Sequence, residues 1–113
     1  HARKARQALL RIFIGEQDTH GGRPLHEWIV RQAREHGLAG ATVLRGLEGF
    51  GASSRLHSAK ILRMSNDLPL VVEIIDTEEK IEAFLPLIDD AVTEGLATIE
   101  RVDVHWYRSG EKS

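Results

Sequence analysis

Six residues near the middle of the chain, LVVEII at positions 70–75, constrain the fold more than any other segment. They are aliphatic on both faces of a strand except at Glu73, and two-sided apolar runs occur where both faces are covered. The run therefore predicts a strand in the middle of a sheet. At 113 residues the chain is long enough for one hydrophobic core and not for two.

Three further strands are predicted around this one. Apolar and polar residues alternate with a period of two over residues 8–14 and 98–107, which is typical of half-buried strands. Residues 41–50 begin with β-branched side chains and end with glycines, so this strand should fray into a loop over 51–67.

Apolar residues at helical spacing predict two helices. The first covers residues 24–37 and should begin on its proline. The second covers 76–95, with Asp76 as the N-cap and Glu79 three residues later. Pro86 should kink this helix or split it, because it removes a backbone hydrogen bond.

The order strand, helix, strand, strand, helix, strand predicts an α+β fold, the ferredoxin-like βαββαβ sandwich, with two helices on one face of a four-stranded antiparallel sheet. We expect one domain over residues 8–108. Residues 1–7 should form a disordered or non-native start, and residues 109–113 a C-terminal tail.

The sheet face without helices is predicted to be too apolar for free exposure to water. Arg11 and Glu73 fall on this face, beside an apolar set consisting of Leu9, Phe13, Val71 and Ile75. Exposed apolar patches of this kind mark interaction sites, so we expect another subunit to cover it.

Charge and composition argue against several classes of protein. The net charge is −2 although residues 1–6 hold three basic residues, so the rest is more acidic still, and general binding to nucleic acid is not expected. No apolar run approaches the roughly 18 residues of a membrane span. The chain has no cysteine, which suits a reducing compartment, and we expect a cytoplasmic protein.

A segment rich in glycine and cations follows the second predicted strand. Residues 49–66 contain three formal positive charges, Arg55, Lys60 and Arg63, and no acid. This imbalance favours anion binding, although an exposed hairpin loop needs the same residues for bending and charge.

Within that segment, particular residues suit a phosphate. Gly49 and Gly51 let backbone N–H groups approach a ligand, Ser53 offers a hydroxyl donor, and Arg55 can fork onto phosphate oxygens. A small hydrolase or phosphatase could instead pair Ser53 with His57, but no strained nucleophile turn is present.

Residues 15–23 form a second polar cluster, before the first helix. Glu16, Asp18 and His20 could gather on a cation, or Asp18 could hold a ribose hydroxyl. Loops of turn-forming polar residues are the commoner explanation, so we predict no metal.

Four stretches strongly resemble the DUF190 (UPF0166) family of PII-like signalling proteins: residues 14–18, 22–30, 37–76 and 80–90. The resemblance implies a trimer whose sheets face inward, with a nucleotide site between subunits at the base of the loop after the second strand. It also implies that this loop changes order when an adenine nucleotide binds and thereby changes contact with a partner, often a membrane transporter or channel.

The resemblance has two departures. Residues 89–95 lack the glycine-rich phosphate loop of classical PII proteins and add negative charge, which favours AMP or ADP over ATP as the regulatory ligand. The modifiable loop tyrosine is also missing, since Tyr107 is the only tyrosine.

The leading hypothesis is a non-enzymatic PII-like homotrimer that needs no cofactor and binds an adenine nucleotide. Its predicted contact residues are Gly49, Gly51, Ser53, Arg55, Asp18, Lys60 and Arg101. A small hydrolase and an interaction module without a small ligand are the alternatives.

Overall fold

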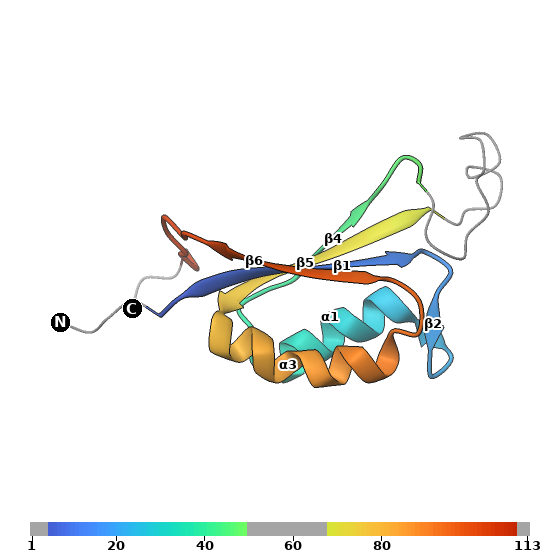
Figure 1. The fold of residues 1–113 in the computed structure, drawn as a ribbon, viewed down its shortest axis with the longest axis horizontal. Coiled ribbons are helices and arrows are strands. Elements are labelled where there is room, and N and C mark those ends of the chain that lie inside the picture. The colour runs from blue at the N-terminus through green and yellow to red at the C-terminus, as the bar shows by residue number, and fades with distance from the viewer. Residues whose placement is uncertain (1–4, 50–67, 111–113) are drawn as a thin grey trace.

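A four-stranded antiparallel sheet carries both helices on one face, as the computed structural model shows for residues 5–49 and 68–110 (Figure 1). The strand order across the sheet is β4-β5-β1-β6. The strands are β1 (Gln7–Gly15), β4 (Thr42–Arg45), β5 (Pro69–Thr77) and β6 (Leu96–Val102). The helices are α1 (Leu25–Glu35) and α3 (Glu78–Ala91). The predicted ferredoxin-like fold is confirmed.

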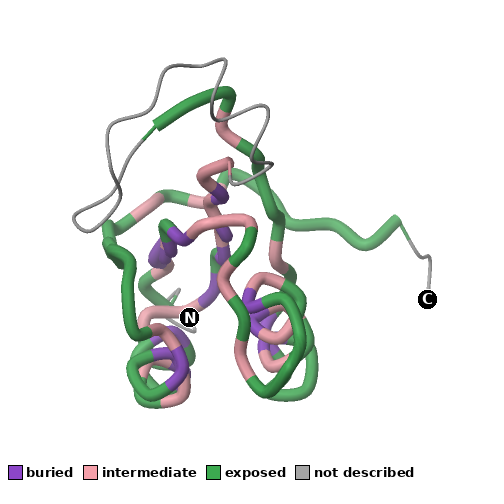
Figure 2. The backbone as a smooth tube through the Cα atoms, turned by 90° about the vertical axis from the view of Figure 1, so that its right-hand side faces the viewer, coloured by how far each residue is buried: buried purple, intermediate pink, exposed green. Residues whose placement is uncertain are grey.

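Alternation within β1 and β5 builds the core. The two strands pair over their full length, with Leu10 opposite Ile74 and Ile12 opposite Val72, and all four side chains are buried. Figure 2 shows the buried residues of both helices on the side that faces the sheet. The helices contribute Leu25, Ile29 and Ala33 from α1, and Ile81, Phe84, Ile88 and Ala91 from α3. The central position predicted for residues 70–75 is confirmed.

The N-cap predicted for the second helix is wrong by one residue. Helix α3 begins at Glu78, and its N-cap is Thr77, whose hydroxyl accepts a hydrogen bond from the Lys80 backbone N–H at 3.2 Å. Asp76 is only 7% exposed. Its carboxylate accepts the backbone N–H groups of Ala39 at 2.8 Å and Thr77 at 2.6 Å. Asp76 thus fastens the segment before β4 to the end of β5.

The other element boundaries also differ from the prediction. Helix α3 is not split at Pro86 and ends at Ala91 rather than at residue 95. Pro86 is exposed, so the carbonyl that loses its partner can be solvated. Helix α1 begins at Leu25, with Pro24 as its N-cap residue.

Strand β6 is shorter than predicted, and a small hairpin was missed. β6 ends at Val102 because its partner β1 begins at the opposed Gln7, which leaves later residues no strand to pair with. β4 covers only Thr42–Arg45. Two short strands, β2 (Thr19–His20) and β3 (Arg23–Pro24), form a hairpin in the predicted polar loop. Gly21 and Gly22, with φ of 59° and 77°, permit its tight turn.

The sheet face away from the helices carries an ion-pair cluster among exposed apolar residues. Arg11 donates to Glu73 at 3.0 Å and to Glu100 at 2.5 Å, and these hydrogen bonds raise the pKa of Arg11. The strand registers place a set of exposed apolar side chains around this cluster: Phe13, Leu44, Ile75 and Leu96. We call this surface the open face.

Replacing Asp76 by alanine should destabilise the fold. The substitution removes a buried acceptor of two backbone N–H groups, and we expect a loss of about 2 to 3 kcal/mol in the free energy of unfolding, measured by urea denaturation. Asp89→Ala is the control, because this exposed acid in the last turn of α3 opposes the helix dipole and its removal should cost nothing. Equal stabilities for the two variants would contradict the role of Asp76.

Candidate functional site

Three strands terminate together beside the segment that was predicted to bind an anion. β1 ends at Gly15, β4 ends at Arg45 and β5 begins at Pro69, all at the same end of the sheet (Figure 1). We call residues 15–18, 45–49 and 68–69 the stem. The stem contains Asp18 and Gly49, two of the predicted ligand residues that lie within the described part of the chain.

Backbone hydrogen bonds hold the stem together. The N–H of Gly46 donates to the carbonyl of Pro69 at 2.7 Å, and the N–H of Glu16 donates to the carbonyl of Leu68 at 2.8 Å. A Cβ at residue 46 would lie 2.8 Å from Cγ of Pro69, so only glycine fits this close approach. The stem is therefore a fixed base for residues 50–67.

Asp18 stabilises the turn that leaves β1. Its Oδ2 accepts the Gly15 N–H at 2.9 Å, and its backbone carbonyl accepts the N–H of Leu25 at the start of α1 at 2.8 Å. Through these contacts Asp18 stabilises the local backbone at the edge of the stem. The ribose contact predicted for it stays a prediction.

An ion pair across the stem involves a cation that was not among the predicted site residues. Nη2 of Arg45 donates to Oε2 of Glu16, so the last residue of β4 is joined to the turn after β1. The side chain of Arg45 is 62% exposed and that of Glu16 is 19% exposed. Position alone could have indicated Arg45, because it directly precedes the glycine-rich segment.

Most predicted ligand residues lie outside the described part of the chain. Gly49 is described, is exposed and lies against Pro69. The residues outside the described range are Gly51, Ser53, Arg55 and Lys60, together with His57 of the hydrolase alternative. Their contact roles stay predictions.

The polar side chains of residues 15–23 make separate contacts and do not converge on one site. Asp18 serves the turn, Glu16 pairs with Arg45, and the ring of His20 lies 4.4 Å from that of Trp28, between centroids. Within residues 5–49 and 68–110, no three His, Asp or Glu side chains are grouped to hold a metal ion.

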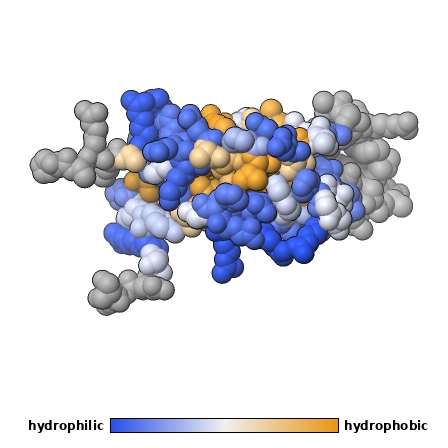
Figure 3. Space-filling view, turned by 90° about the horizontal axis from the view of Figure 1, so that it is seen from below, coloured by the Kyte–Doolittle hydropathy of each residue, from blue (hydrophilic) through white to orange (hydrophobic). Residues whose placement is uncertain are grey.

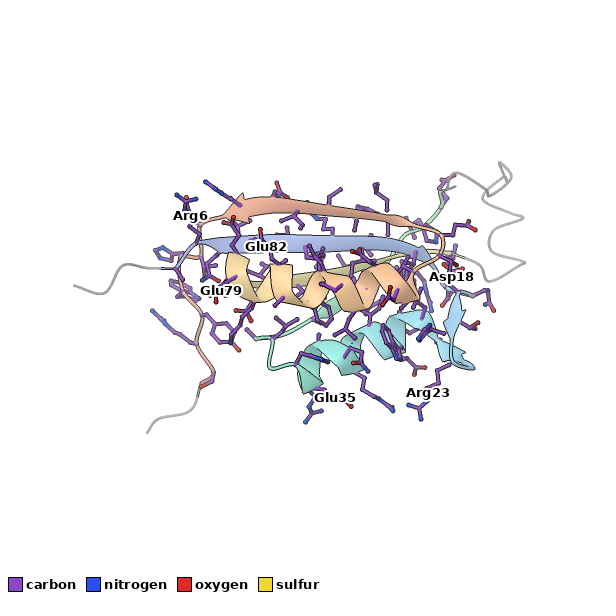
Figure 4. All side chains as sticks on the ribbon, turned by 60° about the horizontal axis from the view of Figure 1, so that its bottom comes forward. Arg6, Asp18, Arg23, Glu35, Glu79 and Glu82 are labelled. Atoms are coloured by element: carbon purple, nitrogen blue, oxygen red, sulfur yellow. The ribbon has the colours of Figure 1, made fainter. Side chains whose placement is uncertain are left out.

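Arg101 lies at the other end of the sheet. It pairs with Ala8 near the start of β1, and Gly15 lies seven residue steps further along that strand, which is roughly 23 Å at about 3.3 Å per residue. Figure 4 shows the two ends, with Asp18 at one and Arg6 at the other. One chain therefore does not bring Arg101 and Gly49 into the same site.

Arg101 borders a wide groove at this far end. The groove has a volume of about 1180 Å³, and Ile75, Trp106 and Tyr107 are among its lining residues. The Tyr107 hydroxyl donates to the Ala39 carbonyl at 3.1 Å, which fixes the segment after β6 across the end of the sheet. Nε of Arg101 is 3.6 Å from Oε2 of Glu78 at the start of α3.

The outer surface of the helix layer is largely hydrophilic, with apolar side chains visible along the middle of the molecule (Figure 3). None of the helices in the described ranges combines the length and hydropathy needed to cross a membrane.

The fold matches solved structures of PII-like proteins at low sequence identity. A structure of CPII from Thiomonas intermedia K12, bound to ADP, AMP and acetate, has a TM-score of 0.57 and 16% identity, covering 90% of this chain and 91% of that one. A second, of CPII as a nitrogen regulatory PII-like protein bound to ADP, AMP and bicarbonate, has a TM-score of 0.55 and 16% identity, covering 88% of each chain. This likeness shows a PII-like fold.

Sequence relatives cover nearly the whole chain. A UPF0166 protein of Aquifex aeolicus is 41% identical over 90% of this chain and 96% of its own length. Another UPF0166 protein, from Methanocaldococcus jannaschii, is 32% identical over 88% of this chain and 91% of its own. The profile of DUF190, described as an uncharacterised ACR, matches residues 7–104. The chain belongs to the DUF190 (UPF0166) family.

Proposed function

We propose that this protein is a PII-like regulatory protein that binds an adenine nucleotide between subunits and controls a partner through residues 50–67. The observation that carries the proposal is the stem, where the close approach of Gly46 to Pro69 and the exposed Arg45 lead into residues 49–66, which have three cations and no acid. Such a combination suits a phosphate group.

The ligand class is supported by the structural neighbours. The CPII structures hold ADP with AMP and acetate, ADP with bicarbonate, or ADP with AMP and bicarbonate. In this chain the last turn of α3 has no basic residue and ends near the exposed acids Asp89, Asp90 and Glu94. Because these charges would repel a third phosphate, we propose AMP or ADP rather than ATP.

The homotrimer is supported by the open face. Its exposed apolar residues surround Arg11, whose charge is already matched by Glu73 and Glu100, so a neighbour covering this face would not bury an unpaired arginine. The distance between Arg101 and Gly49 within one chain also supports an oligomer. Both can contact one ligand only if different subunits supply them.

The role is proposed to be regulatory rather than catalytic. A ligand that binds one arrangement of residues 50–67 more tightly than another shifts their population and thus the surface offered to a partner. We propose a membrane transporter or channel as the partner class, in line with the family resemblance. We propose the cytoplasm as the compartment, because adenine nucleotides and the inner face of such a partner are both accessible there.

Nucleotide titration tests the proposed ligand. We expect isothermal calorimetry to show that AMP and ADP bind more tightly than ATP, and that Arg55→Ala weakens ADP binding by about tenfold, the loss of one charge-assisted contact. Arg23→Ala is the control, because Arg23 lies exposed on the β2-β3 hairpin. If none of the three nucleotides binds at millimolar concentration, the proposal is wrong.

A phosphate-release assay distinguishes the regulatory hypothesis from the hydrolase alternative. Incubation with ADP and with a generic phosphate ester should release no phosphate above the rate of a buffer blank. Slow release that His57→Ala abolishes would favour the hydrolase instead.

A charged substitution on the open face tests the trimer. Phe13→Glu places a carboxylate among apolar side chains, and we expect it to convert a trimeric wild type into monomers, measured by light scattering after gel filtration. Ala83→Glu adds the same charge on the exposed side of α3 and should leave the trimer intact. A wild type that stays monomeric at high micromolar concentration would overturn this part of the proposal.

A further inference from the structure

The ion pair between Arg45 and Glu16 joins two strands that are not neighbours. Arg45 ends the edge strand β4, Glu16 follows β1, and β5 lies between them in the sheet. The pair therefore spans the start of β5, beside the backbone bonds that Gly46 and Glu16 make to Pro69 and Leu68. It lies at the base of the segment proposed to respond to ligand.

The two partners are held very differently. Glu16 is fixed, since its side chain is mostly buried and its backbone N–H is bonded to Leu68. The side chain of Arg45 is mostly exposed and stands on an edge strand of four residues. Arg45 is thus the partner that can move, and its guanidinium can leave Glu16 without disturbing the core.

A phosphate competes well for this arginine. An ion pair with one exposed partner contributes little stability, because water screens it and the long side chain must be held in place. A phosphate group carries more charge than one carboxylate and offers several oxygens that accept a guanidinium in parallel hydrogen bonds. A ligand phosphate at the stem should therefore displace the Glu16 carboxylate.

We propose that Arg45 is a phosphate-binding residue of the stem and that Glu16 is its resting partner, which the ligand phosphate replaces. This inference rests on the proposed nucleotide function and adds to it a residue and an order of events. Glu16 lowers ligand affinity by occupying Arg45 in the free protein. When the ligand phosphate displaces Glu16, the ion pair that joins the end of β4 to the turn after β1 is lost. The backbone hydrogen bonds of the stem remain.

Variants of both partners test the exchange, with ADP as the probe in calorimetric titrations. Arg45→Ala should weaken ADP binding by about tenfold or more, because a charge-assisted contact to phosphate is lost. Arg45→Lys should lie between it and the wild type, because lysine keeps the charge but not the fork. Glu16→Gln should strengthen binding by roughly threefold, the competition expected of an exposed ion pair.

The double variant with Glu16→Gln and Arg45→Ala should bind like Arg45→Ala alone, because Glu16 acts through Arg45. Arg23→Ala serves as a control for general loss of positive charge. Circular dichroism melting checks that each variant is folded, and Glu16→Gln, which gains affinity, cannot be explained by misfolding.

Three outcomes overturn the inference and can be told apart. If wild type and Arg45→Ala bind ADP equally well, the nucleotide function stands and the exchange is wrong. If Glu16→Gln weakens binding, Glu16 supports the ligand rather than competing with it, and the exchange is again wrong. If the wild type binds no nucleotide, both the function and the exchange fail.

Discussion

The antiparallel pairing of β1 with β5 is the constraint on which the rest of the structure depends. It runs from Gln7 opposite Thr77 to Gly15 opposite Pro69, without a bulge. One set of alternate residues is thereby committed to the helices and the other to the open face. The same register decides which residues lie at the stem and which lie at the far end. A shift by one residue would move the core side chains to the open face.

The architecture could be predicted because it depends on apolar patterns within each element, which can be recognised in the sequence before the strand register is known. The two-sided apolar run of β5 indicated its central place, and helical spacing indicated which faces of α1 and α3 are buried. Element ends were less predictable, since they depend on partners distant in sequence. Asp76 looks like an N-cap from its neighbours alone, yet its carboxylate is used by Ala39, 37 residues earlier. Likewise, β6 stops where β1 has no more residues to offer.

The sequence predicted an anion site and its contact residues, and these contacts stay predictions. Glycines and cations without acids pointed to anion binding near Gly49, which lies at the stem. Arg101 was grouped with it, although the two belong to opposite ends of one chain. A sequence does not state whether distant residues meet across subunits. The place of Arg45 before the glycine-rich segment was a local signal, but its ion pair with Glu16, 29 residues earlier, could not be predicted, because a cross-strand ion pair has no local signature.

The first strand begins and the last strand ends at the end of the sheet opposite the stem. β1 begins and β6 ends at the far end of the sheet, and residues 103–107 stay there because Tyr107 is bound to Ala39 (Figure 1). Fluorescent labels or surface anchors attached near Gln7 or Val102 would therefore stand about one sheet length away from the stem. Attachment at that end of the sheet would keep the stem directed away from the support.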